Sequence, residues 1–132
     1  MAHILIVEDD SDFSAMLVHA LTAERHEIRR VANAKEAVHV IDSNWPELLI
    51  ADYFLLDPVM DGGDLARHLS GLRPQTPIIF VSAMPRAVLD REAQRLPKCR
   101  VIQKPIDLDV FLATVRAELA SREADAPAQA AE

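Results

Sequence analysis

Residues 4–10 read Ile-Leu-Ile-Val-Glu-Asp-Asp, so four consecutive aliphatic residues run directly into three acidic ones. A strand with one wet face alternates apolar and polar residues, whereas an unbroken aliphatic run suits a parallel strand that is covered on both sides. We therefore predict a buried strand at Ile4–Val7. The acidic residues then lie just beyond its carboxyl end.

Similar aliphatic runs occur at Leu48–Ala51, Ile78–Val81 and Val101–Ile102. The stretch Ile28–Val31, which two arginines interrupt, fits a more exposed edge strand. Between the runs, apolar residues recur at the spacing of amphipathic helices. This spacing is clearest in two groups: Phe13, Met16, Leu17, Ala20 and Leu21, and Leu108, Phe111, Leu112, Val115 and Leu119.

Helix-start signals mark two of the other helices. Asn33 followed by Glu36 resembles a capping box in front of apolar residues at helical spacing. Gly62-Gly63-Asp64 precedes a helix that carries Leu65, Leu69 and Leu72. A further helix through Val88, Leu89 and Leu96 has the weakest pattern.

Strand and helix thus alternate five times, and right-handed crossovers convert such an alternation into a parallel sheet with helices on both faces. We predict an α/β fold, a doubly wound (βα)5 sandwich whose five-stranded parallel sheet has the order 2-1-3-4-5. The domain is expected to cover residues 1–120. Residues 121–132 lack large apolar side chains and are predicted to form a flexible C-terminal tail.

Length, composition and net charge exclude several classes of protein. The 132 residues fit one domain, and 50% of them are hydrophobic, which is enough for a core. The formal net charge of −7 disfavours nucleic-acid binding, because a phosphate backbone would be repelled. One cysteine cannot form an internal disulfide, and the sequence shows neither a signal peptide nor a membrane-spanning run. We therefore expect a soluble cytoplasmic protein.

The polar residues that follow the predicted strands are the candidate site. They are Glu8 and Asp9, Asp52, Ser82 and Lys104. In an open parallel sheet, ligands bind beyond the carboxyl ends of the strands. Clustered carboxylates repel one another and favour a hard divalent cation such as Mg²⁺. With a lysine cation and a serine hydroxyl nearby, Asp52 is the candidate nucleophile for attack on phosphorus.

Four segments together resemble the receiver domain of two-component response regulators, which has a flavodoxin-like fold. They are residues 4–10, residues 46–53 (Pro-Glu-Leu-Leu-Ile-Ala-Asp-Tyr), residues 77–83 (Pro-Ile-Ile-Phe-Val-Ser-Ala) and Lys104-Pro105. The resemblance covers about residues 3–120, and the order and separation of the segments make it specific.

The resemblance implies a role for each site residue. Asp52 is the phosphorylated aspartate, Ser82 the switch hydroxyl, and Lys104 the lysine that contacts the phosphoryl group. The metal ligands are Glu8, Asp9, Asp52 and the backbone carbonyl of Phe54, with Mg²⁺ as the ion. The family also favours a cis bond before Pro105, although trans is the commoner state of such bonds in general.

We therefore expect a stand-alone phosphorelay switch that catalyses its own phosphorylation and dephosphorylation at Asp52. The expected donor is a sensor histidine kinase or a histidine phosphotransfer protein. A downstream protein is expected to read the face formed by the fourth helix, fifth strand and fifth helix. A phosphate relay or sink without an output contact remains open. We do not expect a conventional enzyme: a magnesium-dependent phosphohydrolase with an aspartyl nucleophile usually has a second aspartate two residues after the first, and Phe54 occupies that place here.

The sequence departs from the family pattern at three places, and the first two keep an alternative open, a receiver-like interaction module that works without phosphorylation. The stretch of residues 54–62 is longer than in many members by a residue or two. Val101 replaces the tyrosine or phenylalanine that often lies three residues before the lysine. The first acidic position is Glu8 rather than aspartate.

Three other groups of residues have simpler interpretations. Asp10, Asp12, Asp57 and Asp61 are interpreted as solvated loop acids, and Cys99 as an ordinary buried thiol. Residues 85–100 carry five basic and two acidic side chains, a net charge of +3. That segment is either a solvated helix face or a docking patch for an acidic partner.

Overall fold

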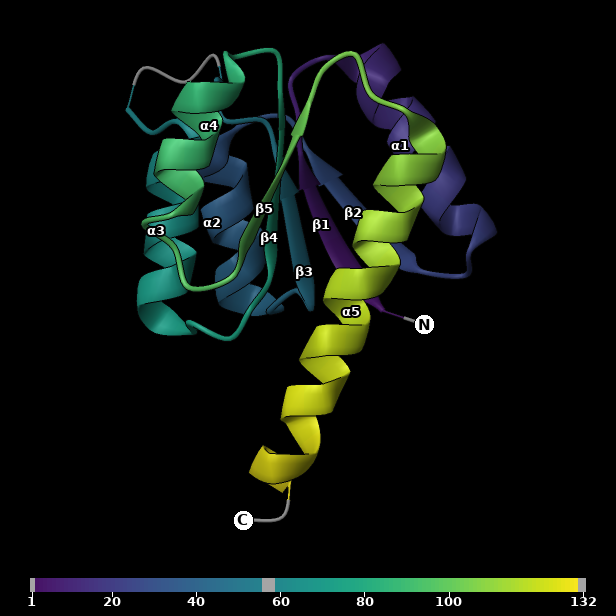
Figure 1. Cartoon of the computed structure of the whole chain (residues 1–132), viewed down its shortest axis with the longest axis vertical. Coiled ribbons are helices and arrows are strands. Elements are labelled where there is room, and N and C mark those ends of the chain that lie inside the picture. Colours follow the sequence, from purple (N-terminus) through teal and green to yellow (C-terminus); the bar gives the residue numbers. More distant parts are fainter. Residues whose placement is uncertain (1, 56–58, 131–132) are drawn as a thin grey trace.

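The computed structural model describes residues 2–55 and 59–130, and within them strands and helices alternate along the chain. The strands are β1 (His3–Val7), β2 (Glu27–Val31), β3 (Leu48–Ala51), β4 (Ile78–Ser82) and β5 (Cys99–Gln103). They form one parallel sheet in the order β2-β1-β3-β4-β5 (Figure 1). The predicted fold class and strand order are confirmed.

The helices are α1 (Ser11–Ala23), α2 (Ala34–Ser43), α3 (Gly62–Leu72), α4 (Arg86–Ala93) and α5 (Leu108–Ala130). α1 and α5 cover one face of the sheet, and α2, α3 and α4 lie on the other (Figure 1). Alternate residues of β1 supply the two cores: Ile4 and Ile6 pack toward α1 and α5, whereas Leu5 and Val7 pack toward α2 and α3. Burial on both faces explains why the strand sequences do not alternate.

Two acidic residues that we interpreted as solvated are in fact helix caps. Asp10 accepts hydrogen bonds from the amides of Asp12 and Phe13, each 3.0 Å long, at the start of α1. Asp61 and Asp64 form a reciprocal capping box at the start of α3. These side chains satisfy amides that have no partner inside the helix. Asp10 is exposed, as a solvated acid should be, but both residues also serve as helix caps, a role that the interpretation missed. Asp57 lies outside the described residues.

Two helices differ in length from the predicted segments. α4 ends at Ala93, so Leu96 lies beyond it, although it packs partly against the core. The backbone of α5 remains helical to Ala130, past the position where we expected a flexible tail to begin. A domain boundary at residue 120 therefore stays a prediction. Among the described residues, no helix combines the length and apolar character needed to cross a bilayer.

Candidate functional site

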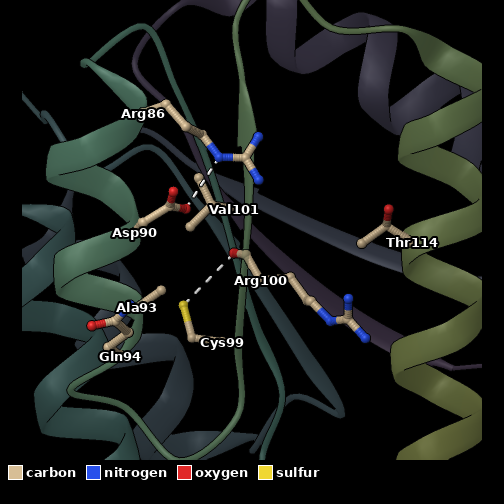
Figure 2. Close-up of a pocket in the computed structure, with 8 residues that line it drawn as sticks. All are labelled: Arg86, Asp90, Ala93, Gln94, Cys99, Arg100, Val101 and Thr114. Carbon is tan, nitrogen blue, oxygen red and sulfur yellow. Dashed lines mark hydrogen bonds and ion pairs between the residues drawn. The ribbon is translucent and has the colours of Figure 1, made fainter.

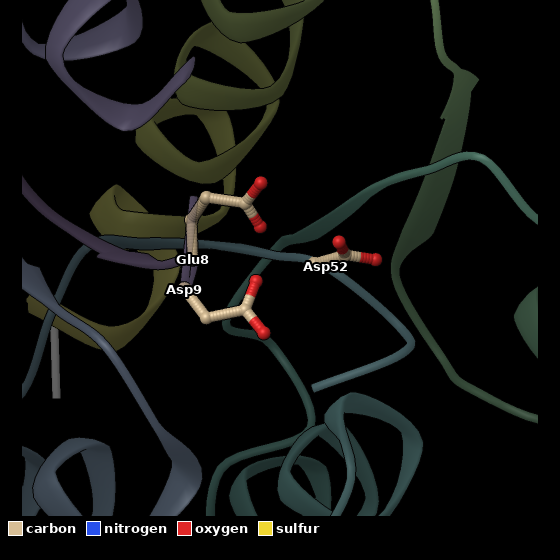
Figure 3. A group of neighbouring side chains, drawn as sticks. All are labelled: Glu8, Asp9 and Asp52. Carbon is tan, nitrogen blue, oxygen red and sulfur yellow. The ribbon is translucent and has the colours of Figure 1, made fainter. Parts of the chain in front are cut away.

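The sheet places three carboxylates side by side. β1 and β3 are neighbours in register, Val7 opposite Ala51, and the amide of Asp52 donates to the carbonyl of Val7 across 3.1 Å. Glu8, Asp9 and Asp52 therefore leave the same edge of the sheet and point toward a common space (Figure 3). Each offers an oxygen, and these oxygens lie within 4.8 Å of one another.

Lys104 reaches this cluster from the end of β5. Its Nζ donates to Glu8 Oε1 at 2.7 Å and to Asp52 Oδ2 at 3.2 Å, and it also lies 4.3 Å from the centre of the Phe13 ring. The peptide bond between Lys104 and Pro105 is cis, in agreement with the family pattern. The chain thus joins residues that are far apart in sequence into one charged network.

Burial changes the pKa values of the charged groups in this network. Desolvation raises the pKa of Glu8 to about 7, and the charge of Asp52 adds to the rise, although the Lys104 ammonium opposes it. Burial lowers the pKa of Lys104, but its bond to Glu8 and the charge of Asp52 outweigh that effect, so this pKa lies above its ordinary value. Glu8 Oε2 is buried and accepts no hydrogen bond from any described residue.

These observations fit a hard divalent cation. Three carboxylates with an unsatisfied buried oxygen are a donor set that Mg²⁺ prefers, and a cation would offset their mutual repulsion. Phe54, whose carbonyl is the fourth predicted ligand, donates its amide to Asp52 Oδ1 at 3.1 Å. That bond places residue 54 beside the acceptor, while the role of its carbonyl stays a prediction.

Ser82 lies at the end of β4 and is buried. Its Oγ accepts a hydrogen bond from the amide of Met84 at 3.3 Å, and its carbonyl accepts one from the amide of Lys104 at 2.8 Å. The backbone therefore ties Ser82 to Lys104. All five side chains predicted from the strand ends lie at the same edge of the sheet.

Sequence reasoning missed two residues of the site. Phe13 supports Lys104 through its ring, and Gly62 packs against the backbone of the acceptor segment. Gly62 donates its amide to the carbonyl of Tyr53 at 2.8 Å, and a Cβ there would lie 2.0 Å from the carbonyl oxygen of Asp52. The glycine pair at the start of α3 was the available signal for Gly62.

Gly62→Ala should therefore destabilise the protein. The added methyl group meets backbone atoms that cannot rotate away, so we expect a loss of about 2–4 kcal/mol in the free energy of unfolding. Gly71→Ala is the matched control in the same helix, because a Cβ there meets nothing within 4 Å. It should stabilise by about 0.5–1 kcal/mol. Urea unfolding measures both; equal effects would contradict the close packing at Gly62.

The raised pKa of Glu8 predicts a pH dependence of stability. Because the pKa is about 7 in the folded protein and 4.5 ordinarily, the unfolded chain loses this proton first as pH rises. The contribution of Glu8 to the free energy of unfolding is therefore complete below pH 4.5 and is lost as pH rises through about 7. The expected loss is on the order of 2 kcal/mol.

This dependence is measured by urea unfolding in the presence of a chelator, with fluorescence of Trp45 as the signal. Glu8→Gln should flatten the fall between pH 4.5 and 7, because glutamine carries no titrating proton. An equal fall in the wild type and in Glu8→Gln would show that another group causes it.

Comparisons with known proteins agree with the geometry. A family model described as "Response regulator receiver domain" matches residues 4–116. The transcriptional regulatory protein TcrA of Mycobacterium tuberculosis is 34% identical over 115 residues, which are 86% of this chain and 44% of TcrA. The response regulator receiver protein CpdR of Brucella abortus is 29% identical over 108 residues, 82% of this chain and 88% of CpdR.

Solved structures give the same result. A two-component response regulator from Clostridium difficile superposes with a TM-score of 0.83 at 25% identity, and the match covers 91% of this chain and 97% of that one. The chain spans less than half the length of TcrA.

Proposed function

The chain belongs to the receiver domain family of two-component response regulators, and on that premise we propose that it is a signalling switch controlled by phosphorylation of Asp52. One observation carries the assignment of this residue. Asp52 shares a site with Asp9 and the buried Glu8, while Lys104 is bonded to it and Ser82 ends the next strand. These are the groups that phosphoryl transfer to a carboxylate needs.

The proposed reaction is an in-line displacement at phosphorus. A carboxylate oxygen of Asp52 forms the new P–O bond as the P–N bond of a phosphohistidine breaks, and the electron pair of that bond stays with the imidazole, which takes up a proton. Lys104 neutralises charge on the transferred oxygens from its position beside Asp52. We propose that Ser82, which ends the strand beside β3, turns toward the new phosphoryl group.

Receiver domains generally bind Mg²⁺ at an acidic pocket, and this chain has such a cluster. We propose that Glu8, Asp9, Asp52 and the carbonyl of Phe54 hold the ion. When bound, Mg²⁺ would neutralise charge that develops on the phosphoryl oxygens. The buried oxygen of Glu8 supports this proposal, because a cation would supply the partner it lacks among the described residues.

Receiver domains typically receive their phosphoryl group from sensor kinases or phosphotransfer proteins. We propose a sensor histidine kinase or histidine phosphotransfer protein as the donor here, and a cytoplasmic location. A downstream protein is proposed to read the face of α4, β5 and α5. Support comes from two hydrogen bonds beside the site: the Lys104 amide donates to the Ser82 carbonyl, and Gln103 Nε2 of β5 donates to the Met84 carbonyl at 3.0 Å.

Intact mass after incubation with acetyl phosphate tests the proposed function. With Mg²⁺ present, we expect the protein to gain one phosphoryl group, and with a chelator in its place we expect no gain. The interaction-module alternative predicts no gain in either case, together with no binding of Mg²⁺ in a calorimetric titration.

A further inference from the structure

β2 is an edge strand of the sheet, because it pairs with β1 on one side only (Figure 1). On that side, the amide of Glu27 donates to the carbonyl of Ala2 at 2.8 Å. Successive residues of a strand turn their backbone groups to opposite sides. Ile28 and Arg30 therefore direct their amides and carbonyls to the open edge, where no described residue bonds to them.

The side chains of β2 divide between the two faces of the sheet. Val31 belongs to the core beneath α2 and α3, and Ile28 packs partly against the core beneath α1 and α5. Arg29 therefore lies on the α2 face and Arg30 on the α1 face, and both are exposed. Along residues 28–31 the edge thus presents an apolar residue, two cations and a second apolar residue.

A groove of about 500 Å³ lies beside β2, on the face that α2 covers, and extends this surface. Arg29 and Lys35 contribute cations to its lining, and His39 contributes an imidazole ring. Val31 and Val40 supply apolar surface in the same groove. A chain that runs along the edge of β2 would find room here for side chains that are both acidic and apolar.

The cations of this surface have no anionic partner among the described residues. The side chains of Arg29 and Lys35 form no hydrogen bond or ion pair there, and Arg30 donates to a backbone group, the carbonyl of Glu8, at 3.1 Å. Glu36, the acidic residue of the groove lining, accepts a hydrogen bond from a backbone amide ahead of its own helix. An incoming carboxylate would therefore meet cations that are still unpaired.

Two arginines near the opposite edge of the sheet differ in this respect, because carboxylates of the same chain pair with them. Arg86 of α4 bonds to Asp90 at 3.1 Å (Figure 2), and Arg100 of β5 bonds to Glu118 at 2.8 Å. The β2 edge presents cations without such anions, in a chain whose net charge is −7. An acidic segment would be attracted to this edge and repelled by much of the remaining surface.

The same arginines disfavour a second copy of the chain as the occupant of the edge. Charged side chains on an edge strand commonly prevent the pairing of one sheet with another. Two β2 strands side by side would bring Arg29 and Arg30 of one copy against those of the other, and like charges on facing strands are destabilising. The charges therefore select a different, acidic segment.

We infer that the open edge of β2 binds an extended acidic segment of a partner protein, which adds a sixth strand to the five-stranded sheet. Opposite residues 28–31 the added strand would read apolar, acidic, acidic, apolar, so that its carboxylates meet Arg29 and Arg30. This pattern is the same in both directions and therefore suits a parallel or an antiparallel strand. Strand addition uses no side chain of the carboxylate cluster, and it therefore does not rest on the proposed function.

The test uses the full chain labelled with ¹⁵N and the capped peptide Thr-Thr-Val-Glu-Glu-Val-Thr-Thr. In a titration followed by NMR, we expect saturable shifts of the amides of residues 28–31. With the peptide at saturation, hydrogen exchange of the Ile28 and Arg30 amides should slow about tenfold or more, because each amide gains a hydrogen bond. Unchanged exchange of these two amides would overturn strand addition.

Two further peptides test the pattern of charges. A peptide with Glu-Val-Val-Glu at its centre has the same composition and net charge, but its carboxylates lie opposite Ile28 and Val31. It should bind about fivefold or more weakly. A peptide with Val-Lys-Lys-Val at its centre should show no saturable binding, because its cations face arginines. Equal binding of all three peptides would show unspecific association and would overturn the inference.

Variants of the protein locate the binding site. Arg29→Glu reverses an exposed charge and should weaken binding about fivefold or more. Ile28→Pro removes an amide that faces the open edge, a position at which edge strands tolerate proline, and should also weaken binding. Arg91→Glu is the matched control, because Arg91 is an exposed residue of α4, far from β2 in the sheet order. Equal weakening by Arg91→Glu, or full binding by Arg29→Glu, would overturn β2 as the site.

Discussion

Asp9→Asn should slow phosphorylation of this protein by acetyl phosphate on the order of 10²-fold at a fixed Mg²⁺ concentration. The substitution keeps the size of the side chain but removes one of the three charges that attract the ion. Loss of about 3 kcal/mol of charge stabilisation in the transition state corresponds to such a factor. The rate is followed by intact mass at successive times.

The control for this variant is Asp12→Asn. Asp12 also carries a carboxylate close in sequence, but it is exposed in the first turn of α1 and lies outside the cluster. Its replacement should leave the rate within a factor of about two. Raising the Mg²⁺ concentration should partly restore the rate of Asp9→Asn. A rate for Asp9→Asn that matches the wild type at every Mg²⁺ concentration would remove this residue from the proposed metal site.

Replacement of Phe54 by asparagine together with Met84→Glu should shorten the lifetime of the phosphoryl group at least about tenfold. Phe54 lies two residues after Asp52, and Met84 lies two residues after Ser82. A backbone hydrogen bond holds each of them beside that site residue. The amide of Phe54 is bonded to Asp52, and that of Met84 to Ser82. Large apolar side chains at these positions cannot orient an attacking water, whereas an amide and a carboxylate can.

Decay of the phosphorylated protein after removal of the donor measures this lifetime. Val59→Asn is the matched control, because Val59 is also an exposed apolar residue of the segment between β3 and α3. It should leave the decay unchanged. Phe54 as a residue is 63% exposed, so its replacement carries little risk to the core. An unchanged decay in the double variant would show that other groups control access of water.

The sheet could be predicted from sequence because its strands are buried on both faces. Unbroken aliphatic runs such as Ile4–Val7 and Ile78–Val81 suit strands of a parallel sheet that is covered on both faces. The preference for right-handed crossovers then restricts the topology of that sheet. The same logic predicts that Glu8, Asp9 and Asp52 lie together, since the carboxyl ends of parallel strands share one edge of the sheet. The resemblance to receivers supplied the role proposed for each of them.

Other features depend on contacts that no local pattern encodes. Asp10 and Asp61 could have been predicted as helix caps, because each directly precedes a helix. In the sequence, however, a capping aspartate looks the same as an aspartate in a solvated loop. The support of Lys104 by the Phe13 ring depends on where α1 lies relative to β5. The pKa of Glu8 depends on burial, which its position beside two other acids did not reveal.

The role of Asp52 as the phosphoryl acceptor is the central claim, and chemical location of the phosphoryl group tests it most directly. Borohydride reduces an aspartyl phosphate to homoserine, which peptide mapping by mass spectrometry can place in the chain. After treatment with acetyl phosphate and Mg²⁺, we expect homoserine at position 52 of the wild type and no phosphoryl gain in Asp52→Asn. Homoserine at another aspartate, or undiminished phosphorylation of Asp52→Asn, would contradict the account.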